Sequence, residues 1–274
     1  MSRPSPAQNP SFRALHAPGH LLILPNAWDA GSACLVAACG AAAVATTSAG
    51  LAWSCGYPDG NLLPAAVLRA AIAEIVRAIA VPLSVDLEAG YTADPTGVGE
   101  LVAGVVGEGA VGINLEDGGD APDLLCAKIE GARRAADRAG VDLFVNARTD
   151  VFLRRLAPAG QSVAETLHRA RRYRAAGCDG LFVPGVSSPE QIRAIADGAG
   201  PDLPLNVMAL AGLPAAGALR DLGVRRLSAG AGLAAAAYGR ARRLATDFLR
   251  DGRSDPFSEE AVGYVEMNAL FTRA

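Results

Sequence analysis

The chain has 274 residues, of which 51% are hydrophobic and 19% charged, and its formal net charge is −3. This apolar content with little net charge excludes a disordered chain. The same charge offers no basic surface for nucleic acid or an anionic membrane, so neither is an expected partner. Five cysteines without a Cys-x-x-Cys pair argue against a disulfide framework or zinc ribbon and predict a cytoplasmic protein. No apolar stretch reaches the roughly 18 residues of a membrane-spanning helix.

Short apolar runs alternate with longer helical patterns along the chain. Buried strands are expected at 21–24, 42–46, 81–86, 111–115, 141–146, 180–183, 205–207 and 225–228. Helices are expected at 29–39, 64–79, 95–108, 122–139, 162–176, from 189, at 214–222 and at 232–250, with a Gly-, Ser- and Trp-rich loop over 47–61. The strands are continuous apolar runs, which are typical of parallel strands covered on both faces.

Eight strands, each followed by a helix, predict a (β/α)8 TIM barrel. A single barrel domain is expected over 1–274, with a flexible N-terminus over about 1–11. An additional C-terminal helix is expected over about 258–270, within a helical extension of about 255–274 that could be exchanged between subunits. A doubly wound sheet is the alternative, but the first strand ends in Pro25-Asn26 and not in a glycine-rich turn.

Charged side chains follow three neighbouring strands of the predicted barrel, at the ends where barrel enzymes carry their chemistry. Asp86 and Glu88 share one side of the third strand end, Glu116 follows the fourth strand and Arg148 the fifth. Converging carboxylates need a cation, a proton or an arginine. Oxygen ligands of this kind suit Mg²⁺, with Mn²⁺ as an alternative, and Arg148 offers a planar fork for a substrate carboxylate.

Small and polar residues at the other strand ends extend this predicted site. The backbone N–H groups of Ser48-Ala49-Gly50, after the second strand, could hold an anion. Trp28 and Asn206, at the ends of the first and seventh strands, are further substrate-binding candidates. The segment 228–232 is typical either of a phosphate cup, as in phosphosugar isomerases, or of close helix packing. A metal, an arginine and an anion-binding loop together indicate a small 2-oxo or hydroxy acid as the ligand.

Plainer interpretations stay open for several of these residues. Arg148 could pair with Asp150 and cap the next helix, Ser48 could cap backbone groups, and Trp28 is more typical of a packing residue. Lys128, the only lysine, is expected within a helix. This position argues against a Schiff-base aldolase, which needs a lysine at a strand end.

Five motifs at successive strand ends carry a family resemblance. They are Leu-Pro-Asn-Ala-Trp-Asp (24–29), Thr-Thr-Ser-Ala-Gly (46–50), Val-Asp-Leu-Glu-Ala-Gly-Tyr (85–91), Gly-Ile-Asn-Leu-Glu-Asp (112–117) and Asn-Ala-Arg-Thr-Asp (146–150). In this order the chain resembles the isocitrate lyase/phosphoenolpyruvate mutase superfamily from about Phe12 to about Gly239. The resemblance implies a (β/α)8 barrel, Mg²⁺ and an enolate-type intermediate.

The resemblance also implies roles for individual residues. Asp86 would bind the metal directly, and Glu88 and Glu116 would bind it through metal waters. Substrate contacts would come from Ser48, Ala49 and Gly50 at the C1 carboxylate, with Asp59 supporting that end, and from Arg148 at a substrate oxygen. Asp59, Glu116 and Arg148 are therefore the expected catalytic residues. Superfamily members are often tetramers that exchange C-terminal helices, so a homodimer or homotetramer is expected.

The chain departs from the superfamily pattern in two segments. Asp86-Leu87-Glu88 replaces the usual Asp-x-Asp, and 118–126 replaces the Lys-Arg-Cys-Gly-His loop of the lyases, with Cys126 expected at a helix start. The preferred hypothesis therefore needs no loop cysteine. It is a Mg²⁺-dependent carbon–carbon lyase or decarboxylase for a small 2-oxo or hydroxy di- or tricarboxylate such as oxaloacetate. The alternatives are an isocitrate- or methylisocitrate-type lyase, a phosphonopyruvate-processing enzyme, and a non-catalytic barrel that binds a 2-oxo acid.

Overall fold

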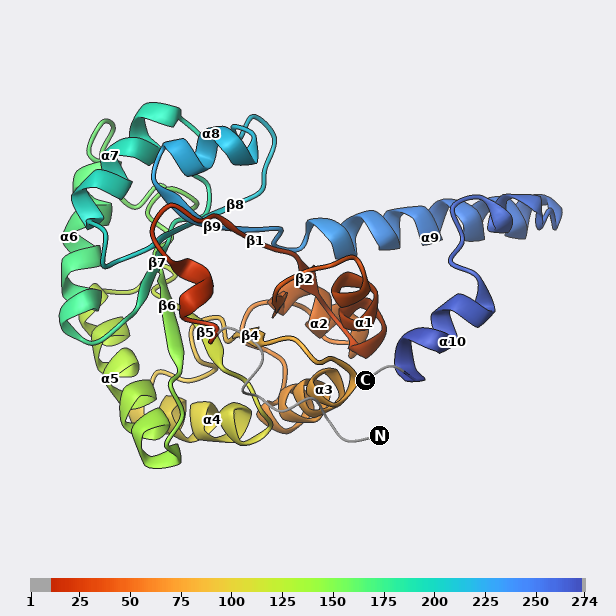
Figure 1. Ribbon diagram of the computed structural model, residues 1–274, viewed down its shortest axis with the longest axis horizontal. Helices are drawn as coiled ribbons and strands as arrows, with labels where there is room; N and C mark the ends of the chain where they lie inside the picture. The colour runs from red at the N-terminus through yellow and green to blue at the C-terminus, as the bar shows by residue number, and fades with distance from the viewer. Residues whose placement is uncertain (1–10, 273–274) are drawn as a thin grey trace.

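The computed structural model describes residues 11–272, and over these residues nine parallel strands alternate with helices in a nearly closed barrel (Figure 1). The strands are β1 (Leu22–Leu24), β2 (Asn26–Ala27), β3 (Val44–Thr46), β4 (Leu83–Asp86), β5 (Gly112–Glu116), β6 (Phe144–Arg148), β7 (Gly180–Phe182), β8 (Leu205–Met208) and β9 (Val224–Ser228). Their order in the sheet is β1-β9-β8-β7-β6-β5-β4-β3-β2. The predicted TIM-barrel class is therefore confirmed.

The first predicted strand, 21–24, is β1, and an additional strand of two residues, β2, follows Pro25, which accounts for nine strands where eight were expected. β1 pairs with β9, and β2 pairs with β3. Proline has no N–H to donate to a ladder, so it interrupts the pairing. The Pro25 carbonyl accepts from Ala45 N at 3.2 Å, which starts the pairing with β3. The chain thus changes neighbours at Pro25 and brings the two edges of the sheet together.

Helices surround the barrel and continue beyond it. They are α1 (Ala30–Ala38), α2 (Ser48–Ser54), α3 (Ala65–Ala78), α4 (Pro95–Gly107), α5 (Pro122–Ala139), α6 (Ser162–Ala175), α7 (Pro189–Ala199), α8 (Ala216–Asp221), α9 (Gly232–Asp251) and α10 (Tyr264–Thr272). None of the helices over residues 11–272 is both long and apolar enough to cross a membrane.

Two sequence predictions about helices need correction. α2 lies within the segment expected to be a loop, because Leu51 and Ala52 are buried and their packing outweighs the local glycine and serine signal. The predicted C-terminal helix exists as α10, but it begins at Tyr264, after a 3₁₀ turn at Asp255–Ser258. The expected flexible N-terminus falls, except for residue 11, outside the described residues.

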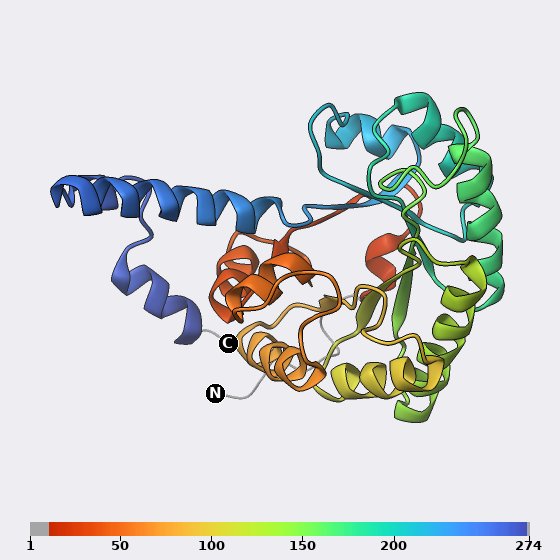
Figure 2. The same cartoon turned by 180° about the vertical axis from the view of Figure 1, so that it is seen from behind.

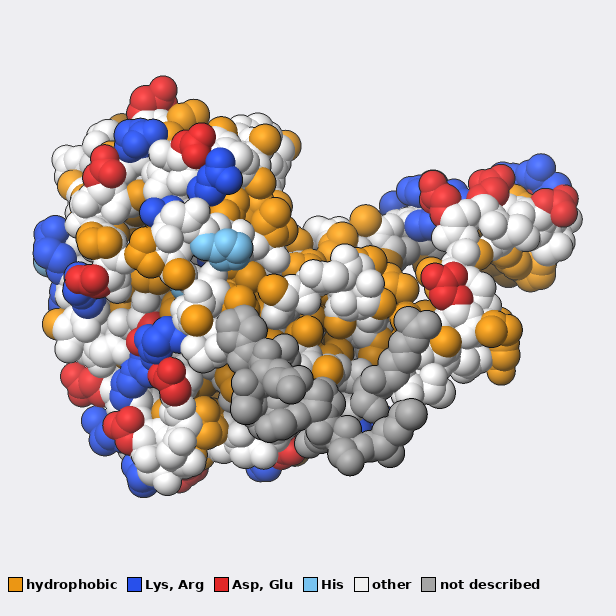
Figure 3. All heavy atoms as spheres, viewed as in Figure 1, with side chains coloured by type: hydrophobic (Ala, Val, Ile, Leu, Met, Phe, Trp, Pro, Cys, Tyr) orange, Lys and Arg blue, Asp and Glu red, His pale blue; other side chains and the backbone are white. Residues whose placement is uncertain are grey.

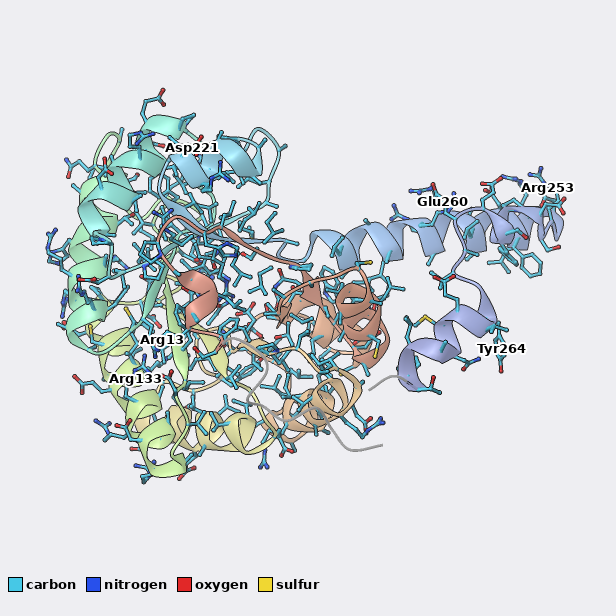
Figure 4. All side chains as sticks on the ribbon, in the orientation of Figure 1. Arg13, Arg133, Asp221, Arg253, Glu260 and Tyr264 are labelled. Carbon is cyan, nitrogen blue, oxygen red and sulfur yellow. The ribbon has the colours of Figure 1, made fainter. Side chains whose placement is uncertain are left out.

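Apolar side chains fill two regions of the barrel. The larger core lies between the strands and the helices, and a smaller cluster of Phe12, Leu15, Leu22, Leu24, Ala43, Ala45 and Phe144 gathers at the strand starts. The segment before β1 is anchored there by charge as well, since Arg13 lies 2.7 Å from Asp179, which Arg133 of α5 also contacts (Figure 4). The N-terminal end of the barrel is therefore closed, and the opposite end carries the polar residues.

The last two helices leave the barrel. α9 projects away from it and α10 folds back toward α1 (Figures 1 and 2). At α1, an added Cβ on Gly31 would lie 3.5 Å from Met267 of α10. Hydrophobic side chains are exposed on α10 and at the outer end of α9 (Figure 3).

Candidate active site

Three predicted acidic residues end neighbouring strands. Asp86 closes β4, Glu88 follows it by two residues, and Glu116 closes β5. The two strand ends are tied together, because Glu116 N donates to Glu88 O at 2.9 Å. The Asp86 carboxylate accepts from Ser48 N at 3.3 Å, while Asp86 N donates to Thr46 Oγ1 at 2.8 Å. The barrel therefore gathers these three carboxyl groups at the C-terminal ends of its strands.

The carboxyl groups influence one another electrostatically. Burial raises the pKa of Asp86, of Glu88 and, most clearly, of Glu116, whose pKa rises to about 8. Neighbouring carboxylates add to each rise: Asp59 acts on Asp86 and Glu88, and Asp86 acts on Glu116. The positive charge of Arg148 opposes the rise at Asp86 and Glu116. Asp59 is therefore close enough to Asp86 and Glu88 to act on them electrostatically.

Arg148 lies between two carboxylates. Its Nη1 is 2.7 Å from Glu116 Oε2, and its Nε and Nη2 donate to Asp150 at 2.8 and 3.2 Å. The Asp150 side chain is fully buried. The pairing with Asp150, the plainer interpretation, is thus present together with the predicted approach to the carboxyl cluster. A buried carboxylate holding two guanidinium nitrogens fixes the plane of Arg148.

Asp117 positions the Arg148–Asp150 ion pair through a hydrogen bond to the backbone of Asp150. Its Oδ1 accepts from Asp150 N at 2.9 Å, and its Oδ2 accepts from Arg169 at 2.8 Å and from the Tyr173 hydroxyl at 2.6 Å. Arg169 and Tyr173 were not among the expected site residues, and Asp117 was noted only as the last residue of the motif 112–117. Arg169 and Tyr173 come from α6, and nothing in the linear pattern connects them with the ends of β5 and β6.

The loop that carries Glu88 is held from two sides. Asn61 N donates to Glu88 Oε2 at 2.5 Å, and Asn61 Oδ1 accepts from Ala89 N and Tyr91 N, both at 3.1 Å. Lys128 is buried in α5 and donates to Ala89 O at 2.7 Å. The only lysine therefore supports this loop, which agrees with the argument against a Schiff-base enzyme. Sequence reasoning missed Asn61, because its partners lie 27 or more residues further along the chain.

Trp28 and the residues 48–50 lie together on the other side of the strand ends. Ser48 N is bonded to Asp86, and Ala49 and Gly50 are buried. An added Cβ on Gly50 would lie 2.9 Å from Trp28 Cβ and 3.0 Å from Ala234 Cβ. Gly50 therefore allows close approach of α2 to Trp28 and α9, and the packing interpretation of Trp28 is supported.

Asn206 lies in a polar layer inside the barrel. Its Nδ2 donates to Val207 O at 2.8 Å and to Ser228 Oγ at 3.2 Å, and its Oδ1 accepts from Asn146 at 3.0 Å. Asn146 also donates to Asn114 Oδ1 at 2.9 Å. The structure thus joins Asn206 to interior asparagines, and no contact links it to the acidic cluster.

The glycine-rich segment after β9 has its backbone donors engaged. Ala229 N and Gly230 N both donate to Asn26 Oδ1 at 2.9 Å. A phosphate cup would need these N–H groups for its ligand. The geometry therefore favours the packing interpretation of 228–232.

The residues present fit a hydrated divalent cation. Among residues 11–272, no three His, Cys, Asp or Glu side chains are arranged to hold a metal ion directly. Glu88 Oε1 and Glu116 Oε2 are nevertheless buried without a hydrogen-bond partner, since Arg148 reaches Glu116 at ion-pair distance but without hydrogen-bond geometry. Mg²⁺ keeps several waters and takes one or two carboxylates directly. One direct carboxylate with two water-mediated ones is compatible with this arrangement.

Comparison with known proteins identifies the family. The family model described as phosphoenolpyruvate phosphomutase matches residues 12–249. The chain belongs to the phosphoenolpyruvate phosphomutase family. The resemblance drawn from the five motifs is therefore confirmed. The family contains carbon–carbon lyases and mutases, and the chain is an enzyme of this type.

Three similar proteins illustrate the range of the phosphoenolpyruvate phosphomutase family. A solved structure from Burkholderia cenocepacia J2315, provisionally named a phosphonomutase, is 45% identical with a TM-score of 0.80, covering 86% of this chain and 97% of that chain. An uncharacterized protein of Mycobacterium tuberculosis (strain H37Rv) is 36% identical over 91% of this chain and 94% of its own length. Oxaloacetate decarboxylase of Rhodopseudomonas palustris (strain BisB18) is 32% identical, and the match spans 52% of this chain and 50% of that enzyme.

Proposed function

We propose that this enzyme is a divalent-metal-dependent carbon–carbon lyase or decarboxylase for a small 2-oxo dicarboxylate such as oxaloacetate. The observation that carries the proposal is the convergence of Asp86, Glu88 and Glu116 beside Arg148, with two buried carboxylate oxygens left without hydrogen-bond partners. The similarity to oxaloacetate decarboxylases supports the substrate class, over the half of the chain that it spans.

Asp86 would bind Mg²⁺ or Mn²⁺ directly, and Glu88 and Glu116 would bind it through water. A cation there would draw electron density from the 2-oxo group and adjacent carboxylate of the substrate. The backbone at 48–50 would contact the C1 carboxylate, with Asp59 supporting that end. Arg148, fixed by Asp150, would bind a substrate oxygen.

In oxaloacetate, the C3–C4 bond would break with its electron pair left on C3, and CO₂ would leave. The negative charge would spread from C3 to the 2-oxo oxygen, where the Arg148 guanidinium stabilises it. Water would then give a proton to C3 and yield pyruvate. This reaction needs no loop cysteine, and Cys126 lies within α5. Trp28 and Asn206 would support the site through packing and the interior polar layer.

Pyruvate release from oxaloacetate tests the proposal, with the spontaneous rate subtracted. The wild-type enzyme should require Mg²⁺ or Mn²⁺ and lose turnover in EDTA. Asp86→Asn should lower turnover by about a hundredfold or more, because it removes the direct metal ligand. Asp202→Asn, an exposed residue ion-paired with Arg174, is the matched control and should keep wild-type activity.

A parallel panel decides between the proposal and its alternatives. It contains isocitrate, 2-methylisocitrate, dimethylmalate and phosphonopyruvate, each with a readout for its own product. Preference for one of these over oxaloacetate would replace the proposed substrate. Binding of a 2-oxo acid without turnover of any compound would contradict the proposal and favour the non-catalytic barrel.

We also propose a homodimer or homotetramer that acts on small molecules in the cytoplasm. The exposed apolar side chains of α9 and α10 support an oligomer. All five cysteines, which lie within the described residues, are free, and this supports a reducing compartment.

A further inference from the structure

Arg154 extends the positive charge of the site beyond Arg148. It lies in the turn after β6, where its backbone N donates to Asp150 O at 2.8 Å. Its Nε donates to Asp150 Oδ2 at 3.0 Å, and Arg148 Nη2 lies 3.2 Å from the same oxygen. A single carboxylate oxygen therefore separates the two guanidinium groups.

The two terminal nitrogens of Arg154 have no partner among residues 11–272. Over the part of the chain that the structure describes, Nη1 and Nη2 form no hydrogen bond or ion pair, and the side chain is 55% exposed. Arg148 and Arg154 share one fully buried carboxylate, Asp150, while Arg148 alone also faces Glu116. Arg154 therefore carries a positive charge that is only half compensated, at the edge of the site.

The turn after β5 lies close to this guanidinium. An added Cβ on Gly118 would lie 3.9 Å from Arg154 Nη2, and one on Gly119 would lie 3.9 Å from Nη1. The guanidinium thus lies beside two residues without side chains, directly after Glu116 and Asp117. Because these two residues have no side chain and the Arg154 side chain is more than half exposed, the terminal nitrogens are accessible from solvent.

We propose that Arg154 is a specificity-determining residue that binds the distal carboxylate of a dicarboxylic substrate. The proposal rests on the proposed function, in which Arg148 and the acidic cluster hold the 2-oxo acid end. In a four-carbon 2-oxo dicarboxylate, the 2-oxo carbon and the distal carboxyl carbon are separated by two C–C bonds of about 1.5 Å each, so two guanidiniums that share one carboxylate oxygen can contact both groups of one ligand. An arginine fork also matches a carboxylate with two parallel hydrogen bonds.

Calorimetric binding of lactate and malate in the presence of Mg²⁺ tests this role without requiring turnover. Both are 2-hydroxy acids, and malate adds only the distal carboxylate. The wild-type enzyme should bind one enantiomer of malate about tenfold to a hundredfold more tightly than lactate. Arg154→Gln should remove this preference while leaving lactate affinity within about twofold, and Arg154→Lys should restore part of it. Arg155→Gln, the adjacent exposed arginine, should keep it.

The outcomes separate the two proposals. Equal affinity of the wild-type enzyme for lactate and malate, or a malate preference retained in Arg154→Gln, would overturn the role of Arg154. An equal loss for both ligands in Arg154→Gln would also overturn it, because it would show a structural effect through Asp150. Absence of oxaloacetate turnover in an enzyme that still prefers malate through Arg154 would contradict the proposed reaction and leave this recognition role intact.

Discussion

His16 is a buried base at the closed end of the barrel. Its ring stacks on Phe144 at 4.1 Å, and its Nδ1 is 3.0 Å from Phe12 O. Burial, reinforced by the charge of Arg226, lowers the pKa of His16 from 6.5 to about 3. The unfolded chain therefore binds more protons than the folded protein between these two values. The contribution of His16 to the free energy of unfolding therefore falls as the pH decreases through this window.

Between pH 7 and pH 5, the contribution of His16 to the free energy of unfolding should fall by about 2 kcal/mol. The reason is that pH 5 lies about 1.5 units below the pKa of His16 in the unfolded chain. Urea denaturation of the wild type and of His16→Gln at the two pH values isolates this loss as a difference, because Glu116, whose pKa is raised to about 8, changes stability in the opposite direction in both proteins. His16→Gln should lose about 2 kcal/mol less than the wild-type protein over the same interval, whatever its stability at pH 7. His20→Gln, at an exposed histidine, should follow the wild type. Equal pH dependence in His16→Gln would contradict the prediction.

Some site residues can be recognised from the sequence alone, and others cannot. Asp86, Glu116 and Arg148 were recognisable because each ends an apolar run, and parallel strands bring such ends together. Asn206 lies within an apolar run and within β8, and its amide is bonded in the interior layer. Asn61 follows no strand and was missed. Position at a strand end is a local property, whereas the hydrogen-bond partner depends on the neighbouring strand and register.

At the scale of elements, α4 and α5 cover the two strands that carry the acidic cluster. They approach closely at two glycines: an added Cβ on Gly131 would lie 2.6 Å from Pro95 O, and one on Gly99 would lie 3.2 Å from Gly131 O. The obstacle at Gly131 is backbone, which cannot turn aside as a side chain would. The spacing between α4 and α5 therefore depends on the missing side chain.

Gly131→Ala should destabilise the protein by up to about 2 kcal/mol. Alanine favours the helix by about 1 kcal/mol over glycine, but the forced separation of the helices typically costs about 1–3 kcal/mol. Gly107→Ala, at the end of α4 with nothing within 4 Å of the added Cβ, is the matched control and should be neutral or slightly stabilising. Urea denaturation compares the two variants with the wild-type protein. A Gly131→Ala variant more stable than the wild type would contradict the prediction, because it would show that α4 and α5 separate without an energetic cost.

At the scale of the whole molecule, α9 and α10 leave a large apolar surface exposed. Leu249 and Tyr264 are each 84% exposed and Val265 is 79% exposed, and Tyr264 points outward from α10 (Figure 4). Soluble monomers rarely expose large contiguous apolar patches. A second copy of the chain would bury these side chains.

Sedimentation equilibrium at micromolar concentration should show a dimer or tetramer. Leu249→Glu combined with Val265→Glu should shift it toward monomer, with unchanged circular dichroism, because a charge buried in the interface would be unpaired. Arg253→Glu, an exposed charge in the same region, should leave the mass unchanged. A monomeric wild-type protein would contradict the oligomer, and an oligomer unaffected by the double substitution would place its interface elsewhere.

The sequence by itself determined the eight strand positions, most helices and the family. The signals that mark these elements act over a few neighbouring residues. They are the apolar runs, helix caps such as Asp29 at α1, and helix-starting residues such as Pro122 at α5. Hydrophobic periodicity thus records burial locally, before any tertiary contact is known. The same locality located the acidic residues at the strand ends.

Only the tertiary structure decided which of those residues act together. It added β2 after Pro25, formed α2 within the expected loop, and engaged the donors of Ala229 and Gly230 with Asn26. It also placed Arg154 and Arg148 on opposite sides of one Asp150 oxygen. Each outcome depends on contacts between segments that the barrel brings together, and short-range side-chain patterns carry no record of those distances.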